Sequence, residues 1–420
     1  MRRRQPIHNG GGRRIGGHRD IIRNGPECPP DRTASLIAVT SAHPVDQFAI
    51  PSGLDDVPAA VGGVLDDFFG RVFPHAAAID PVVGEAATML REFTMNGGKR
   101  IRPTLVYAGW RCGVSERDRL RPGDGDNPAE ALRAGAAIEL IQACALVHDD
   151  IIDRSDTRRG RPTIHRELES THADAGWSGS PAAFGVAGAI LIGDLALSWA
   201  DDLFHGVGVA EEMPAGPLRR GAARRAGAVW AAMRTEVLGG QILDVVNESR
   251  GNESVSAAYR VMEFKTAAYT VARPLELGAT LAGGSVELIN ALRSIGHDLG
   301  IAFQLRDDLL GVFGDPEQTG KPSGDDLVAG KRTALIAVGL NRAGAAVGGE
   351  LRGLIGRELS AEELARAREI LVDVGAVADM EQRIDHLGER AQATITALNT
   401  DDSVRAELSA LGHRLGHRQR

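Results

Sequence analysis

One stretch of the chain limits the possible fold more than any other, the run from Ala136 to Ile152, which is mostly apolar until it ends in an acidic group. On a helix, Asp149 and Asp153 lie one turn apart on the same face, with Asp150 beside them. Carboxylates at the end of a buried helix repel one another and lose solvation, so a cation is needed to compensate. Mg²⁺ suits this place because it binds carboxylate oxygens and keeps water and substrate phosphate oxygens as ligands. The run therefore predicts a buried helix that ends in a magnesium site.

A second run has the same design. The helical pattern from Val286 to Val312 carries Asp307 and Asp308 after a long apolar stretch. Other aspartate pairs, such as Asp325–Asp326, lack this context and are expected to lie on the solvated surface. Two facing helices with acidic ends would clamp a cluster of metal ions between them, and this is the arrangement that we predict.

Helical periodicity dominates from Leu54 onward, and no segment shows the sustained alternation of a β-strand. Single helices are expected at 222–246 and 255–277, and a loop at 314–330. Ser360 and Glu363 form a capping box in front of a further amphipathic run. Aromatic residues are only 4% of the chain, so Ala, Leu, Val and Ile must build the core. These features predict an all-α fold, a large single-domain helical bundle.

The N-terminal segment differs from the rest. Residues 1–54 are rich in Arg, Gly and Pro and are expected to be a disordered leader, whereas 55–420 form the folded domain. The net charge of −8 argues against a nucleic-acid partner. The run from Ala182 to Ile192 is too short to cross a bilayer and is expected to be a buried helix, so no transmembrane segment is predicted. Three cysteines without metal-binding spacing favour a reducing, cytoplasmic location.

Basic residues gather near both acidic runs and near one glycine pair. They are Lys99, Arg100 and Arg102 after Gly97-Gly98, Arg158 and Arg159 after the first acidic run, and Lys321 and Lys331 after the second. Arginine forks match phosphate oxygens, and lysine acts as a point charge. Surface salt bridges would explain any one of these groups, but the whole set favours a diphosphate substrate bound through magnesium.

In this order of motifs, the chain resembles the trans-isoprenyl diphosphate (polyprenyl) synthases over roughly residues 55–420. The matching motifs are Gly97-Gly98-Lys99-Arg100 with Arg102-Pro103, Asp149-Asp150-Ile151-Ile152-Asp153, Arg158-Arg159-Gly160, Gly193-Asp194, Gly240-Gln241 with Asp244, Lys265-Thr266, Phe303-Gln304, Asp307-Asp308-Leu309-Leu310 and Gly320-Lys321. The resemblance implies the isoprenoid synthase fold, a homodimer, and a prenyltransferase that condenses an allylic diphosphate with isopentenyl diphosphate.

The resemblance also implies a role for each site residue. Magnesium, with three ions per site, would be held by Asp149, Asp153 and Asp307, and Asp150 and Asp308 would complete the acidic motifs. The allylic diphosphate would meet Arg158, Lys265, Lys321 and Lys331. Isopentenyl diphosphate would meet Lys99, Arg102, Gln142 and Arg159, while Arg100 and Gln241 complete the substrate-binding set. Thr266 and Gln304 would turn oxygen dipoles toward the allylic cation.

Two positions depart from the family pattern. Gly311 stands where many members carry a third aspartate, which leaves Asp307 and Asp308 to serve the metal. Gln142 stands where many bacterial members have histidine, but a glutamine amide can still donate to a diphosphate oxygen.

The resemblance implies that product length depends on residues one and two turns before the first acidic motif. Cys144 and Ala145 are small where short-chain members tend to place an aromatic floor, and Ile141 is the next candidate floor. One further turn is about 5.4 Å of helix, room for roughly one more prenyl unit. The sequence thus favours geranylgeranyl diphosphate over the fifteen-carbon product, unless residues from other helices close the tunnel.

Two alternatives remain open. A class I terpene cyclase shares the fold and the first acidic motif, but it does not need the second diphosphate site implied by Lys99, Arg102 and Arg159. A non-catalytic partner subunit of a synthase should have lost site residues, whereas this chain keeps nearly all of them.

Overall fold

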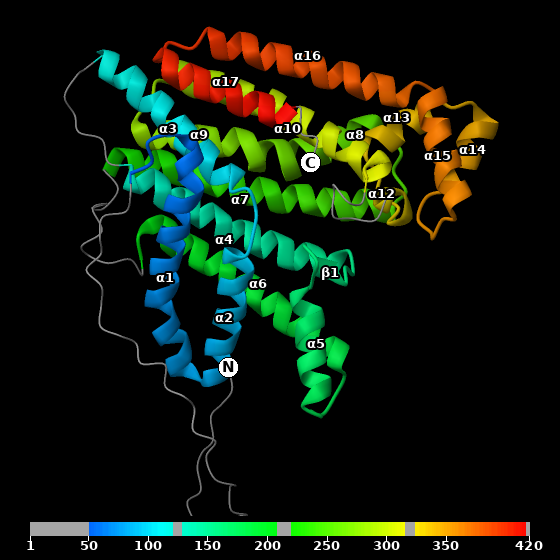
Figure 1. Cartoon of the computed structure of the whole chain (residues 1–420), viewed down its shortest axis with the longest axis horizontal. Coiled ribbons are helices and arrows are strands. Elements are labelled where there is room, and N and C mark those ends of the chain that lie inside the picture. The colour runs from blue at the N-terminus through cyan, green and yellow to red at the C-terminus, as the bar shows by residue number, and fades with distance from the viewer. Residues whose placement is uncertain (1–49, 121–127, 208–219, 316–323, 417–420) are drawn as a thin grey trace, which may run out of the picture. The chain divides into compact units, whose positions relative to one another are not determined.

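The computed structural model describes residues 50–120, 128–207, 220–315 and 324–416. In these ranges the chain is helical almost throughout, which confirms the predicted all-α class (Figure 1). The only strands in the described ranges are β1 (Thr157–Arg158) and β2 (Arg161–Pro162), which pair as a short antiparallel ribbon. The expected leader lies mostly outside the described residues. Pro51 and Leu54 are already buried, so the packed part includes the last residues assigned to that leader.

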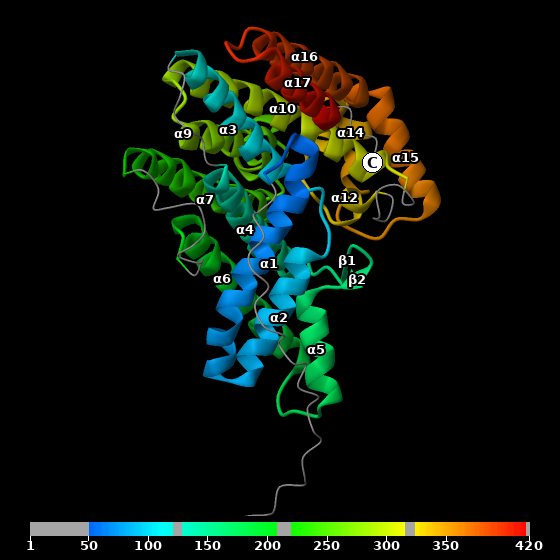
Figure 2. The same ribbon diagram turned by 60° about the vertical axis from the view of Figure 1, so that its left-hand side comes forward.

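The first half of the chain surrounds one central helix, α4 (Ala129–Ile152). Around it lie η1 (Leu54–Asp56), α1 (Val57–Ile79), α2 (Pro81–Met95), α3 (Ile101–Leu120), α5 (Ile164–Asp174) and α6 (Pro181–His205). Helices α1, α3 and α6 all pack against α4 (Figure 2). Its side chains are buried almost without interruption up to Ile141, and half-buried positions are mixed with buried ones from there to Asp149. The apolar run therefore forms the buried helix that its sequence predicts.

The prediction of one continuous helix at 255–277 is wrong, although the stretch is helical. That stretch divides into α8 (Val255–Val261), the π-helical segment η2 (Met262–Ala272) and α9 (Arg273–Ala282). A π-helix bonds residue i to i+5, so its side chains repeat at a wider interval than those of an α-helix. This spacing turns Lys265, Thr266, Tyr269 and Thr270 toward one cavity. Apolar periodicity cannot distinguish such a segment from an ordinary helix.

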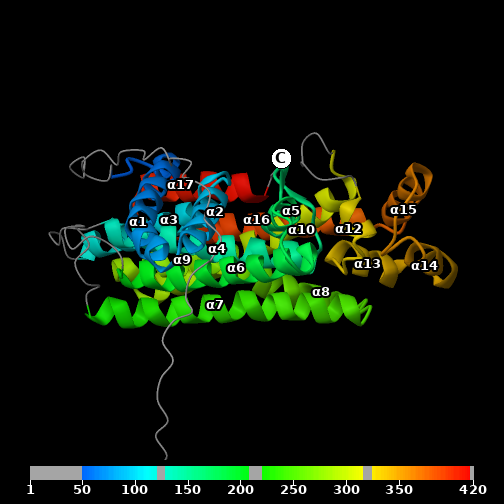
Figure 3. The ribbon, with the colours of Figure 1, turned by 90° about the horizontal axis from the view of Figure 1, so that it is seen from below.

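The second half is built on two long helices, α7 (Arg220–Ser249) and α10 (Val286–Phe313). Figure 3 shows α13–α15 at the opposite end from α1 and α3. The remaining helices are α12 (Asp325–Val328), α13 (Ala334–Arg342), α14 (Ala345–Arg352), α15 (Ala361–Asp373), α16 (Ala376–Thr396) and α17 (Asp402–Gly416). The predicted capping box at Ser360 and Glu363 is confirmed at the start of α15. Helix α12 lies inside the expected loop at 314–330.

The burial expected for the run from Ala182 to Ile192 is not found. Helices α4 and α6 are both long and apolar enough to cross a membrane by length and composition. In the most apolar window of α4, 78% is buried inside the protein, whereas only 28% of the corresponding window of α6 is buried. Ile190 and Leu191 are exposed on α6, and Leu238 and Ile242 are exposed on α7. The correction follows from packing, because α4 and α5 cover only part of α6.

Candidate active site

A cavity of about 240 Å³ lies between α4, α6, α7, η2 and α10. Both acidic motifs reach it, since Asp149 from α4 and Asp307 from α10 line the same space. Lys265 and Gln304 lie at the same end of the cavity. The two acidic helices therefore face a common volume, as the sequence predicts.

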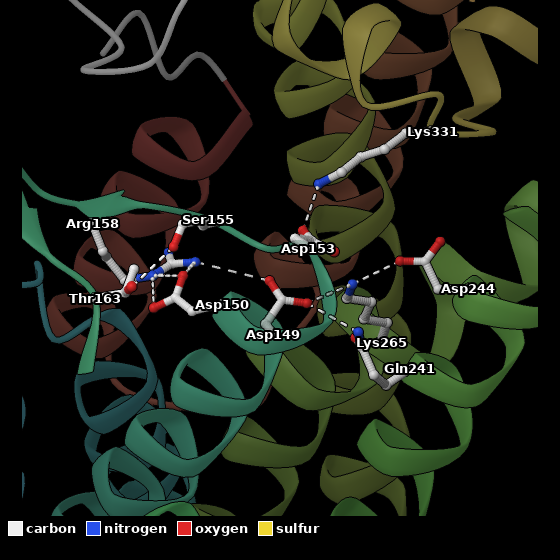
Figure 4. Close-up of polar contacts among 10 residues, drawn as sticks. All are labelled: Asp149, Asp150, Asp153, Ser155, Arg158, Thr163, Gln241, Asp244, Lys265 and Lys331. Atoms are coloured by element: carbon white, nitrogen blue, oxygen red, sulfur yellow. Dashed lines mark hydrogen bonds and ion pairs between the residues drawn. The ribbon is translucent and has the colours of Figure 1, made fainter. Parts of the chain in front are cut away.

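Asp149 is the centre of the charged network at this end (Figure 4). Its Oδ1 accepts a hydrogen bond from Gln241 Nε2 at 3.0 Å and lies 3.4 Å from Lys265 Nζ. Burial alone would raise the pKa of the carboxyl, but the nearby cations, first Lys265 and then Lys331, hold it below its usual value. Asp149 is thus ionised and ready to bind a cation.

A second aspartate fixes each lysine of this network. Lys265 Nζ donates to Asp244 Oδ2 at 2.7 Å, and Lys331 Nζ lies 3.3 Å from Asp153 Oδ2 (Figure 4). Burial opposes the charge of both lysines, but the surrounding carboxylates outweigh burial and raise the pKa of each. Both lysines therefore present full positive charges toward any anion that enters.

Asp150 plays a different part from its neighbours. It is 1% exposed and holds Arg158 through Nε contacts of 2.8 and 2.9 Å and an Nη2 contact of 2.6 Å. The same Nη2 also lies 3.9 Å from Asp149 Oδ2. Asp150 therefore positions the Arg158 guanidinium beside the first acidic motif and does not face the cavity itself.

In the second motif, Asp308 is also a positioning residue. Its buried carboxylate accepts hydrogen bonds from Gln304 Nε2 at 2.9 Å and from the Ala334 backbone N–H at 3.0 Å. Burial raises the pKa of Asp308 to about 8. Thr266 Oγ1 donates to Gln304 Oε1 at 2.7 Å, so the amide oxygen expected to face an allylic cation is already engaged. The Thr266 hydroxyl oxygen donates in this bond and accepts none from the described residues, so it can turn a lone pair toward a cation in the cavity more readily than Gln304 Oε1 can.

Arg102 and Gln142 line the cavity beside this network. The Arg102 guanidinium lies 4.6 Å from the ring centroid of Tyr269, and its Nη2 donates to Thr270 Oγ1 at 2.8 Å. Its Nε and the Oε1 of Gln142 are buried without a hydrogen-bond partner among the described residues. Buried polar atoms of this kind are usually satisfied by a ligand or by water, so they mark a binding place for a polar group.

Lys99 and Arg159, which are described, lie outside this cavity lining. Arg159 Nη1 donates to the Asn96 carbonyl at 3.0 Å, and a Cβ at Gly97 would lie 3.0 Å from the same nitrogen. The glycine pair therefore lets the segment that carries the exposed Lys99 wrap around this guanidinium. Lys321 lies outside the described residues.

Arg100 corrects an expectation. Its guanidinium is buried, with Nη1 2.6 Å from Glu139 Oε2 and Nη2 donating to the Thr94 carbonyl at 2.8 Å. A guanidinium that is satisfied in this way inside the protein is not available to a substrate. Arg100 instead anchors the start of α3 to α4.

The cavity extends away from the charged end along α4. Cys144, Ala145 and Ile141 line it at about one and two turns before Asp149. Leu197 of α6 and Arg234 of α7 also line it. Arg234 is seven residues before Gln241, which places it roughly 10 Å farther along α7. The far part of the cavity is therefore mostly apolar, with one arginine in its wall.

That arginine is held in place by α6. Arg234 Nη1 lies 2.6 Å from Asp201 Oδ1, and Trp230 Nε1 donates to the same oxygen at 2.8 Å. The guanidinium carbon also lies 5.4 Å from the Trp230 ring centroid. Sequence analysis missed Arg234, because an apolar tunnel gives no reason to look for an ion pair. It also missed the roles of Asp244, Tyr269 and Thr270, which hold Lys265 and Arg102.

The acidic residues fit magnesium better than a metal with a full set of protein ligands. No three His, Cys, Asp or Glu side chains within the described ranges enclose a metal position by themselves. Mg²⁺ usually takes only one or two carboxylates and completes its shell with water and substrate phosphates. That chemistry suits Asp149 and Asp307, which line the cavity, and Asp153, which lies 3.3 Å from Lys331.

Comparison with known proteins gives a consistent result. Residues 84–371 match the model of the polyprenyl synthetase family. A geranylfarnesyl diphosphate synthase from Aeropyrum pernix is 33% identical over 314 residues, which are 74% of this chain and 87% of that protein. A geranylgeranyl diphosphate synthase from Mycobacterium tuberculosis is 34% identical over 328 residues, 77% of this chain and 81% of the relative.

A solved structure agrees with these relatives. The geranylgeranyl pyrophosphate synthase from Corynebacterium glutamicum, complexed with isoprenyl diphosphate and magnesium, has a TM-score of 0.79 and 46% sequence identity. The match covers 87% of this chain and 99% of that one.

Proposed function

The chain belongs to the polyprenyl synthetase family and is a trans-isoprenyl diphosphate synthase, and we propose that its reaction takes place in the cavity between α4, α6, α7, η2 and α10. The enzyme condenses an allylic diphosphate with isopentenyl diphosphate and releases pyrophosphate. One observation carries the assignment of the site. Carboxylates from two separate helices, Asp149 and Asp307, share a single cavity with Lys265.

The allylic diphosphate is assigned to the acidic end of the cavity. Asp149, Asp153 and Asp307 would hold Mg²⁺ there, and bound Mg²⁺ assists the departure of diphosphate by neutralising its charge. Lys265 and Lys331 add fixed positive charge at the same place, so the carbon–oxygen bond of the allylic substrate ionises more readily.

Isopentenyl diphosphate is assigned to Arg102 and Gln142, with Lys99 and Arg159 at the neighbouring glycine segment. The unpartnered Nε of Arg102 supports this assignment, because it can donate to a diphosphate oxygen. The Gln142 amide nitrogen would donate to the same group. The double bond of isopentenyl diphosphate attacks the allylic cation, and the released pyrophosphate takes the proton. The apolar wall at Cys144, Ala145 and Leu197 excludes water, which would otherwise trap the cation as an alcohol.

The experiment that tests this function is a soluble assay with labelled isopentenyl diphosphate, an allylic primer and Mg²⁺. Chain extension by the protein alone is the expected result. A cyclic hydrocarbon would indicate a terpene cyclase, and activity only after addition of a second protein would indicate a partner subunit.

Substitution of Arg102 tests the division between the two substrates. Arg102→Ala is expected to raise the KM for isopentenyl diphosphate by about 10- to 100-fold, because a charge-assisted contact to diphosphate is lost. The KM for the primer should change much less. Thr270→Val removes only the 2.8 Å hydrogen bond that orients Arg102 and should give a smaller change in the same direction. Equal effects on both KM values would contradict the assignment.

We propose geranylgeranyl diphosphate as the main product. Cys144 and Ala145 leave the cavity open one turn beyond Asp149, and Ile141 and Arg234 line it about one turn farther on. The second pair comes from two different helices, so the floor of the tunnel is shared between α4 and α7. The Asp201 ion pair keeps the Arg234 side chain in this wall.

Product length is tested from both sides of the cavity. Ala145→Phe and Cys144→Phe are expected to shorten the main product, because an aromatic ring fills the space beside the acidic motif. Arg234→Ala removes a wall residue and should lengthen it. Chromatography of the dephosphorylated products measures all three variants, with thermal melting as a check on folding. An unchanged length in both Phe variants would rule out this tunnel.

We further propose a cytoplasmic homodimer. The exposed apolar side chains of α6 and α7, such as Leu191 and Ile242, offer a surface that a second copy would cover. Cys112 and Cys144 are free and buried, in keeping with a reducing location. Light scattering of the full chain measures the oligomeric state, and a monomeric mass at micromolar concentration would contradict the dimer.

A further inference from the structure

The second acidic motif has a neighbour that its sequence does not reveal. Gly311 follows Asp307 by four residues on α10, so the two positions share one face of the helix. A Cβ atom at Gly311 would lie 2.0 Å from Asp326 Oδ2 and 2.6 Å from its Cγ. Real Cβ atoms essentially never approach other atoms so closely. The carboxylate of Asp326 therefore occupies the space that a side chain at position 311 would need.

Backbone hydrogen bonds anchor the turn that carries this carboxylate. Asp326 lies in the short helix α12, where the neighbouring Leu327 is fully buried. The Asp326 carbonyl accepts a hydrogen bond from the Lys331 N–H at 3.0 Å, and the Leu327 carbonyl accepts one from the Gly356 N–H at 2.8 Å. Asp326 is thus part of an anchored turn, which corrects the expectation that the Asp325–Asp326 pair is simply solvated.

We propose that Asp326 supplies the third carboxylate of the second acidic motif, reaching from α12 into the place that Gly311 leaves open on α10. This inference rests on the proposed function, because it concerns the Mg²⁺ and diphosphate end of the same cavity. While Asp326 occupies this place, a larger residue at position 311 would displace its carboxylate.

The surrounding charges support this position. Lys331, in the same turn as Asp326, lies 3.3 Å from Asp153 of the first motif. The charge of Asp326 acts on both Lys331 and Asp308. Asp326 therefore lies between the second motif and the lysine that joins it to the first.

The experiment removes the carboxylate at position 326 and introduces one at position 311, separately and together. Asp326→Asn keeps the shape and removes the charge, and it should weaken Mg²⁺-dependent binding of inorganic pyrophosphate, measured by calorimetry, by about 10- to 100-fold. Gly311→Asp alone should lower the melting temperature, because it places a second carboxylate in occupied space. The double variant Gly311→Asp with Asp326→Ala returns one carboxylate from α10 and should recover most of the affinity and of the melting temperature. Asp325→Ala is the matched control and should leave pyrophosphate binding unchanged.

The outcomes separate this inference from the proposed function. If the wild-type chain binds no pyrophosphate with Mg²⁺, the proposed function fails. If the wild type binds but Asp326→Asn binds equally well, Asp326 is not part of the site. If the double variant binds pyrophosphate no better than Asp326→Asn, a carboxylate at position 311 does not replace that of Asp326, and the inference fails. If Asp326→Asn melts at a lower temperature but binds pyrophosphate with unchanged affinity, Asp326 has only a structural role.

Discussion

Replacement of Asp149 or Asp307 by alanine is expected to lower turnover by about two to three orders of magnitude while the fold stays intact. Each carboxylate lines the cavity where the allylic diphosphate is assigned, and groups that stabilise charge in a transition state have effects of this size. Lys265 keeps its 2.7 Å contact with Asp244 when Asp149 is removed, so the change leaves no isolated buried charge. Steady-state kinetics with saturating Mg²⁺ and both substrates measures the effect.

A surface aspartate provides the control for this experiment. Asp373 is exposed at the end of α15, and Asp373→Ala should retain wild-type turnover. Removal of divalent metal with a chelator should abolish turnover of the wild type, and addition of Mg²⁺ should restore it. Wild-type rates without divalent metal, or in either cavity variant, would refute the metal clamp.

The sequence predicts helices best where an apolar run is long. The runs that became α4 and α10 were predicted from periodicity alone, and their aspartates were expected to face each other because each run ends in an acidic pair. Both aspartates do line one cavity. The roles assigned to individual residues remain predictions, because position alone does not measure catalysis.

Features that depend on distant contacts could not be predicted. Arg100 and Arg102 look equivalent in sequence, but the positive φ of 48° at Arg100 turns its side chain inward to Glu139. Asp326 looks like an ordinary surface aspartate in the sequence, because nothing local indicates that it meets Gly311 of α10. The same holds for η2, whose π-type bonding leaves no trace in the apolar pattern.

Two adjacent glycines of α7 provide a test of how the site is positioned. Helix α7 approaches η2 so closely that a Cβ at Gly240 would lie 2.4 Å from the backbone nitrogen of Lys265 and 2.7 Å from its Cα. At Gly239, a Cβ would meet nothing within 4 Å. The two positions therefore differ in whether a methyl group displaces the lysine that contacts Asp149.

Gly240→Ala is expected to reduce turnover by about 100-fold, because a displacement of roughly 1 Å in a positioned catalytic group has effects of that size. Overpacking should also lower the free energy of unfolding by about 1–3 kcal/mol. Gly239→Ala should instead raise it by about 0.5–1 kcal/mol, since alanine favours a helix interior over glycine, and turnover should not change. Kinetics and denaturant unfolding of both variants measure the difference. If both alanines behave alike, the close approach of α7 to η2 does not position Lys265.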